Sequence, residues 1–196
     1  LGTCNRCAAL KWAERYTETL CDILFDRNRT NKTKQIPNGL FFYKTMMQFT
    51  FVTPVNAHID EVAKKFNKEL LLKLNPPFIA MELIRYDGQR AGDQLSFKIG
   101  IGPIKQQWNG IITAHRYTEK HWLFRDEGLQ LPHPLKTWKH THALKSTSNH
   151  QTLIIDRLKF EGKNPFFTLL MCLAFIAMFW MRKPLYKKHL GNHSSL

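Results

Sequence analysis

Four side chains at alternate positions in the C-terminal half could carry chemistry: Trp138, His140, His142 and Leu144. Residues two apart in a β-strand point to the same face of the sheet, so this spacing predicts that both imidazoles share a face with a tryptophan and a leucine. Because two of its members are apolar, we expect this to be the buried face. Imidazoles in such a place can transfer protons, bind a metal or complete a polar network.

A carboxylate occurs in a comparable pattern further along the chain. Asp156 alternates with Ile154 and Leu158 in a run from Thr152 to Phe160 that is typical of a strand. If the two strands are neighbours, the carboxylate and both imidazoles converge in the interior of the protein.

The meeting of His140, His142 and Asp156 has three interpretations. A buried His–Asp pair has a shifted pKa and can act as a general acid or base. Two histidines with one carboxylate also form a known metal-ligand set. The third interpretation is a hydrogen-bonded network that positions a ligand or satisfies polar groups in the core, and we favour it because structural networks are common. We therefore expect no metal or cofactor, and the three residues stay catalytic candidates only.

Other reactive or charged residues have simpler interpretations. Cys4 and Cys7 have the spacing of a metal or redox pair, but no second pair accompanies them. Four cysteines in 196 residues do not make a disulfide framework, so we expect reduced thiols and a cytoplasmic protein. We interpret Asp126 and Glu127 as solvated or paired surface charges.

Hydrophobic periodicity predicts the elements that position these side chains. Alternation from 43 to 51 predicts a first strand that ends at Pro54, and helical spacing from Ile59 to Leu70 predicts a helix. Short strands separated by turns follow, which indicates a curved antiparallel sheet. These strands are predicted at 78–86, 95–101, 107–116, 122–127, 136–144 and 152–160.

The segment from Pro165 to Met181 contains Thr168 as its only polar residue. It is either a membrane span, with the following basic residues on the cytoplasmic side, or a helix buried against the sheet. Seventeen residues is about the lower limit for a span, and the sheet needs a cover on one face. We therefore favour the core helix and keep the membrane-anchored protein with 165–181 as its span as an alternative.

In its order of elements, the chain resembles the helix-grip fold of the SRPBCC superfamily, which includes START-like domains and polyketide cyclases. The likeness covers residues 43–191, and several stretches are similar to the bacterial SRPBCC branch. These stretches are Leu74-Asn-Pro-Pro77, Trp108-Asn-Gly-Ile-Ile-Thr113, Phe124-Arg-Asp-Glu127, Trp138-Lys-His-Thr-His142, Leu153-Ile-Ile-Asp-Arg157 and Met178-Phe-Trp-Met-Arg182.

The resemblance implies an α+β fold in which a curved antiparallel sheet wraps around a long C-terminal helix. It also implies a hydrophobic cavity between sheet and helix, and hence a non-catalytic protein that binds a lipid or a polyketide- or aromatic-like molecule. The alternative is an aromatase/cyclase- or dehydratase-like enzyme that uses His140, His142 and Asp156. The expected ligand-binding residues are Phe97, Ile99, Trp108, Ile112, Trp138, His140, His142, Ile154, Asp156, Leu158, Leu169, Leu173 and Ile176.

Charge and domain organisation complete the prediction. Lysine and arginine exceed the acidic residues by 29 to 15, which favours anionic partners. The basic residues are spread along the chain, so an anionic membrane surface and membrane association are better supported than nucleic acid. We expect an N-terminal extension with a short helix and a linker over residues 1–39, the ligand-binding domain over 40–191 and a tail over 192–196.

Overall fold

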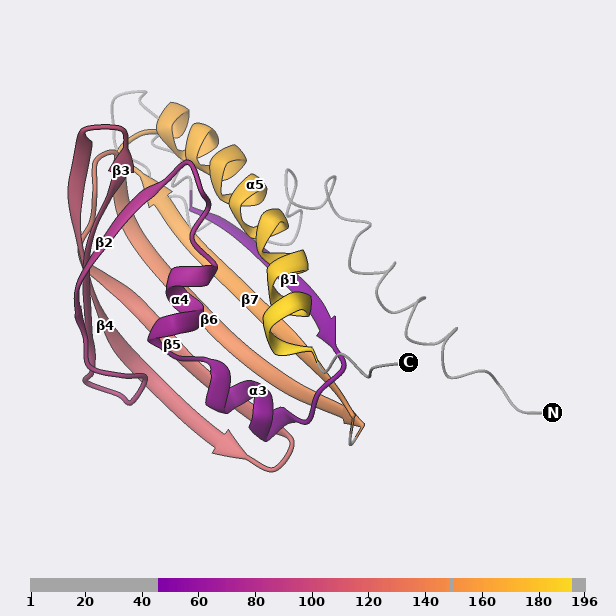
Figure 1. The fold of residues 1–196 in the computed structure, drawn as a ribbon. Helices are drawn as coiled ribbons and strands as arrows, with labels where there is room; N and C mark the ends of the chain where they lie inside the picture. The colour runs from indigo at the N-terminus through magenta and orange to yellow at the C-terminus, as the bar shows by residue number, and fades with distance from the viewer. Residues whose placement is uncertain (1–45, 149, 192–196) are drawn as a thin grey trace, which may run out of the picture. The chain divides into compact units, whose positions relative to one another are not determined.

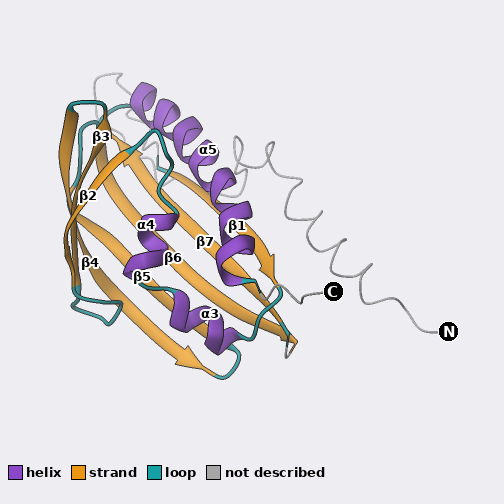
Figure 2. Cartoon of the chain, in the orientation of Figure 1, coloured by secondary structure: helices purple, strands orange, loops and turns teal. Residues whose placement is uncertain are grey.

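The computed structural model describes residues 46–148 and 150–191. In these residues, seven antiparallel strands form one sheet, and three helices lie on one face of it (Figures 1 and 2). The predicted N-terminal extension and the tail lie outside the described residues. The strands are β1 (Met47–Val55), β2 (Ala80–Tyr86), β3 (Gln94–Ile101), β4 (Ile104–Thr118), β5 (His121–Gln130), β6 (Leu135–Ser148) and β7 (Gln151–Gly162), and the helices are α3 (Ile59–Lys65), α4 (Lys68–Lys73) and α5 (Pro165–Leu190).

The sheet follows the order β1-β7-β6-β5-β4-β3-β2. From β2 to β7 each strand pairs with the next along the chain, whereas β1 pairs with β7. The first two strands therefore form opposite edges of the sheet, and α3 and α4 cross between them. All the predicted strands are present and the predicted α+β helix-grip architecture is confirmed.

Pro54 does not end the first strand as predicted. It lies within β1, which continues to Val55, and it faces Leu153 of β7. Proline has no N–H for a strand ladder, but β1 is an edge strand and one of its sides needs no partner. The position of β1 in the sheet, which the local sequence does not reveal, removes the cost of the missing donor.

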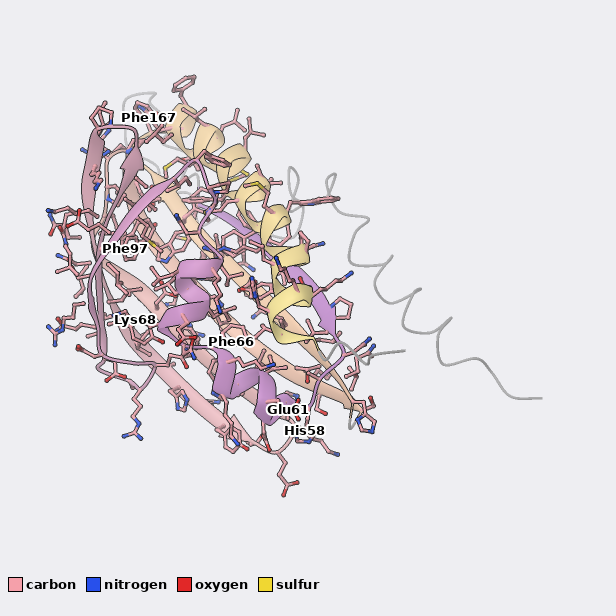
Figure 3. The ribbon with its side chains drawn as sticks, in the orientation of Figure 1. His58, Glu61, Phe66, Lys68, Phe97 and Phe167 are labelled. Carbon is pink, nitrogen blue, oxygen red and sulfur yellow. The ribbon has the colours of Figure 1, made fainter. Side chains whose placement is uncertain are left out.

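The predicted helix over residues 59–70 is two short helices. Phe66 follows α3, and Asn67 begins α4 by accepting a hydrogen bond from the Leu70 amide through its side chain. Asparagine is a favoured helix-capping residue, so it stabilises a new start in the middle of the apolar row. The break places Phe66 between the helices (Figure 3). Its ring packs against Trp122 and Tyr186.

Helix α5 begins directly after β7. Asn164 caps it by accepting a hydrogen bond from the Phe167 amide, and the buried Thr168 hydroxyl accepts from the Gly162 amide at 3.0 Å. A Cβ at position 162 would lie 2.7 Å from the Thr168 amide nitrogen, so only glycine lets the strand and the helix approach this closely. The single polar residue of the apolar segment thus has a structural role at the start of the helix.

Only one side of α5 is buried. Cys172, Phe175, Phe179, Tyr186 and Leu190 are at most 9% exposed and form its inner side, which packs on β1 and β7. By length and composition the helix could cross a membrane, yet only 17% of the residues in its most apolar window are buried. The core-helix prediction therefore describes the inner side of α5 but not its outer side.

Candidate functional site

A cavity of about 140 Å³ lies on the helix-covered face of the sheet. Its walls come from α4 and the Phe66–Asn67 turn before it, from β2 to β6 and from α5, and most of its lining is aliphatic or aromatic. Phe97 stacks on Trp108 with ring centroids 5.4 Å apart, and Trp108 meets Trp138 edge to face at 5.0 Å. A cavity of roughly 150 Å³ in another protein binds one benzene, so this space accommodates about one aromatic ring.

One end of this cavity is polar. His140 and His142 of β6 line it, and Asp156 lies behind them at the register position opposite His142 on β7. His140 Nε2 is 3.2 Å and His142 Nδ1 is 2.7 Å from the same Asp156 oxygen, Oδ1. The structure thus brings together the three residues that alternation placed on the inner faces of two strands.

Asp126 of β5 belongs to this polar end, and its interpretation as a surface charge was wrong. It is 8% exposed, lies opposite His140 in the β5–β6 register and accepts a 2.7 Å hydrogen bond from the Trp138 indole N–H. Its second oxygen is 3.5 Å from His140 Nδ1. The sequence pattern that could have predicted this burial is the alternation of Trp122, Phe124 and Asp126, which places the carboxylate on an apolar face.

Helix α5 adds two groups that the sequence analysis missed. Arg182 lines the cavity, and the fully buried Tyr186 lies close to both Asp156 and Arg182. Arg182 Nε is buried without a hydrogen bond to the described residues, whereas the Tyr186 hydroxyl and His142 Nδ1 both lie close to the Asp156 carboxylate. An unsatisfied buried N–H is costly, so this end of the cavity is suited to a guest that accepts a hydrogen bond from Arg182.

The electrostatics of the site favour a neutral His140 beside an ionised Asp156. Burial lowers the pKa of His140 from its ordinary 6.5, the neighbouring His142 acts in the same direction, and the two carboxylates do not compensate. Burial alone would raise the pKa of Asp156, but the two imidazoles together outweigh it and hold that pKa well below its ordinary value. Burial and the Asp156 charge raise the pKa of Tyr186 well above 10, so its hydroxyl stays a donor.

A metal ion would have one place to bind among the described residues. Ligand atoms of Asp126, His140 and His142 come within 4.8 Å of one another. However, the Asp126 carboxylate already accepts the Trp138 indole, and the Arg182 guanidinium lines the same cavity. A permanent positive charge disfavours a divalent cation, so the geometry supports a hydrogen-bonded network better than a metal centre.

The other expected ligand-binding residues fall into three groups. Phe97, Ile99, Trp108, Ile112 and Trp138 line the cavity as expected. Three further residues do not line it. Ile154 and Leu158 are fully buried on β7, and Ile176 is half-buried on α5. The inward orientation expected for Leu169 and Leu173 is wrong.

Leu169 and Leu173 are 52% and 61% exposed, on the outer side of α5. The helix is apolar on every side, so no polar stripe in its sequence marks the face that meets water. The α5 side chains that line the cavity are Phe175, Met178 and Arg182.

Comparison with known proteins gives structural matches only. No family model and no curated protein matches the chain. Norcoclaurine synthase from Thalictrum flavum matches 80% of this chain and 99% of its own, at a TM-score of 0.51 and 16% identity. The di-domain ARO/CYC StfQ of the steffimycin biosynthetic pathway matches 74% of this chain and 50% of its own, at a TM-score of 0.56 and 11% identity.

A protein from Arthrobacter aurescens matches 70% of this chain and 81% of its own, at a TM-score of 0.52 and 17% identity. At such identities the likeness shows the fold and nothing finer. The described residues have the helix-grip fold that the sequence resemblance predicted.

Proposed function

We propose that this protein binds a small hydrophobic molecule with an aromatic ring and a hydrogen-bonding group, without converting it. The observation that carries the proposal is an aromatic-lined cavity with a polar end, where His140, His142 and Arg182 line the space and Arg182 Nε has no hydrogen bond to the described residues. A ring would pack against Phe97, Trp108 and Ile112, and its polar substituent would meet His140, His142 and Arg182. The space is too small for a long acyl chain unless the helices move apart.

A structural neighbour supports a guest of this size. Norcoclaurine synthase from Thalictrum flavum, whose structure has a TM-score of 0.51 to this chain, was solved in complex with dopamine and hydroxybenzaldehyde, which are single-ring compounds. Together with the cavity volume, this favours aromatic compounds over the lipids that the superfamily also suggests.

Native mass spectrometry of the purified protein tests for a co-purified guest, and titration with p-cresol tests binding directly. Trp108 and Trp138 line the cavity, so their fluorescence should change as the phenol binds. The variant Ile99→Phe fills part of the cavity and should weaken binding by about tenfold or more, because the added ring competes for the same space. Ile84→Phe is the matched control, since Ile84 is 53% exposed on β2. Equal binding by wild type and Ile99→Phe would refute a guest in this cavity.

A second candidate function is acid/base catalysis on the same guest, as in an aromatase/cyclase or dehydratase. The specific observation in its favour is that His140 is buried between two carboxylates, lines the cavity and is held neutral at pH 7, so it can take up a proton. Conversion of a co-purified compound would support this function if His140→Ala lowered kcat by about a hundredfold or more with little change in affinity. Binding without conversion leaves the non-catalytic proposal.

A further inference from the structure

The outer side of α5 presents an unusual amount of apolar surface. Its large apolar side chains that are more than half exposed follow one another at helical spacing. They are Phe166 (69%), Leu169 (52%), Leu170 (52%), Leu173 (61%) and Trp180 (63%). Scattered apolar residues on a protein surface need no explanation, but a continuous patch of this kind marks a contact site.

This patch lies opposite the buried stripe of the same helix. Phe175 and Phe179 face the sheet, whereas Leu173 and Trp180 face away from it. A helix at the surface of a soluble domain ordinarily carries charged or polar residues on its outer face. From Phe166 to Met181, α5 carries no charged residue on any side.

The charge of α5 is concentrated at its C-terminal end and is entirely positive. Residues 165–190 contain no aspartate or glutamate, and their lysines and arginines all follow Met181. Lys187 lies seven residues after Trp180, which places it on the same side of the helix. Lys183 Nζ is 5.3 Å from the Trp180 ring. Tryptophan and lysine next to an apolar stretch are typical of the boundary between lipid chains and headgroups.

We propose that α5 docks flat on an anionic phospholipid bilayer through its outer side. Phe166, Leu173 and Trp180 enter the boundary of the acyl chains, and the basic end of the helix pairs with phosphate and serine headgroups. In most interfacial helices a polar face meets water, but here the opposite face is occupied by the sheet of the same domain. The charge complementarity of a helix without acidic residues identifies the occupant as anionic lipid.

Flat docking fits the packing of α5 better than crossing the bilayer does. Phe179 is 1% exposed and stacks on Phe51 of β1 with ring centroids 5.6 Å apart, and Tyr186 is equally buried. A membrane span would have to withdraw these side chains from the core and remove the α5 wall of the cavity. Flat docking leaves every inner contact in place and covers only surface that is already exposed.

Sedimentation of the full chain with vesicles tests the proposal. Binding to phosphatidylcholine vesicles that contain phosphatidylserine should exceed binding to pure phosphatidylcholine by at least about tenfold and should fall as salt is added. The double variant Leu169→Glu/Leu173→Glu should lose at least about tenfold in partitioning, because it places charge in the acyl boundary. Leu72→Glu is the matched control, since Leu72 is 44% exposed on α4.

A charge-reversed pair separates the electrostatic contribution. Lys183→Glu/Lys187→Glu should weaken binding to the anionic vesicles by at least about tenfold, since each basic residue near such a surface contributes roughly a fivefold factor. Lys64→Glu/Lys65→Glu on α3, where both lysines are exposed, should change binding by less than about threefold. Melting curves of all four variants should stay close to wild type, because the leucines substituted are exposed and the lysines lie at or near the surface.

Several outcomes would overturn the proposal. Equal binding to neutral vesicles, or unchanged binding by the leucine double variant, would place the contact elsewhere. Protein that resists extraction by alkaline carbonate would show a membrane span. A dimer in vesicle-free solution that the leucine variant dissociates would show that a second copy of the chain covers the patch.

Discussion

The two sides of α5 are similar in composition and differ in what surrounds them. Phe179 is 1% exposed and packs on β1, whereas its neighbour Trp180 is 63% exposed. The inner side also provides groups that line the cavity, with Phe175 among the aromatic rings and Arg182 at the polar end. The difference shows that residue type alone does not identify the contacts that hold this fold together, because both sides are equally apolar.

The largest difference in stability between the two sides of α5 is expected for substitutions at the adjacent residues Phe179 and Trp180. Phe179→Ala should lower the free energy of unfolding by about 3–5 kcal/mol, because it leaves a cavity among Phe49, Phe51 and His140. Trp180→Ala should change it by less than about 1 kcal/mol, since the side chain is mostly in solvent. Urea denaturation of both variants measures the contrast, and similar losses would mean that the outer side is also packed in solution.

The polar end of the cavity, which the inner side of α5 faces, should give the next largest effect. His140→Ala should cost about 1–3 kcal/mol, because it leaves the buried Asp126 and Asp156 carboxylates with fewer partners. His121→Ala is the control, since this histidine is exposed at the start of β5 and should be nearly neutral. Thermal melts compare the two, and a neutral His140→Ala would mean that the network does not stabilise the fold.

Acidification should lower the stability of the folded protein through the groups at the polar end of the cavity. The pKa of His140 is lower in the folded protein than in the unfolded chain, so below about pH 6.5 the unfolded chain binds more protons and stability falls. Asp156 has the same direction of shift, so a further loss begins as the pH falls below the ordinary carboxyl value of 3.8. Denaturation at a series of pH values should show both declines. The variant His140→Asn should lack the upper one, and its persistence in that variant would assign it to another group.

The smallest effect is expected on the outer side. Leu173→Ala should change the free energy of unfolding in lipid-free buffer by no more than about 0.5 kcal/mol, because 61% of the side chain is already exposed. Urea denaturation with and without anionic vesicles checks this. A loss of several kcal/mol without lipid would show that the outer side packs against protein.

Much of the site could be predicted from local patterns. Alternation placed Trp138, His140 and His142 on one buried face, because a strand has a strict period of two. The same rule placed Asp156 on an inner face, and the pairing of β6 with β7 made the two faces meet. Asp126 follows this rule as well, and it was misjudged because its neighbours Arg125 and Glu127 are charged.

Arg182 and Tyr186 could not be found in this way. They belong to a helix whose sequence has no polar stripe, so its periodicity does not tell which side faces the sheet. Their proximity to Asp156 depends on the crossing of α5 over the sheet. For the same reason Leu169 and Leu173 were assigned to the cavity although they point outward.

By itself, the sequence determined the strands, their turns, the apolar C-terminal helix and the shared face of two histidines. These features depend on contacts within a few residues of each other, where side-chain period and turn chemistry decide the outcome. The tertiary structure decided which side of α5 is core, that a small cavity remains, and that Asp126, Arg182 and Tyr186 join the histidines. Those features arise from packing between segments far apart in the chain, where burial depends on the partner surface rather than on the residue alone.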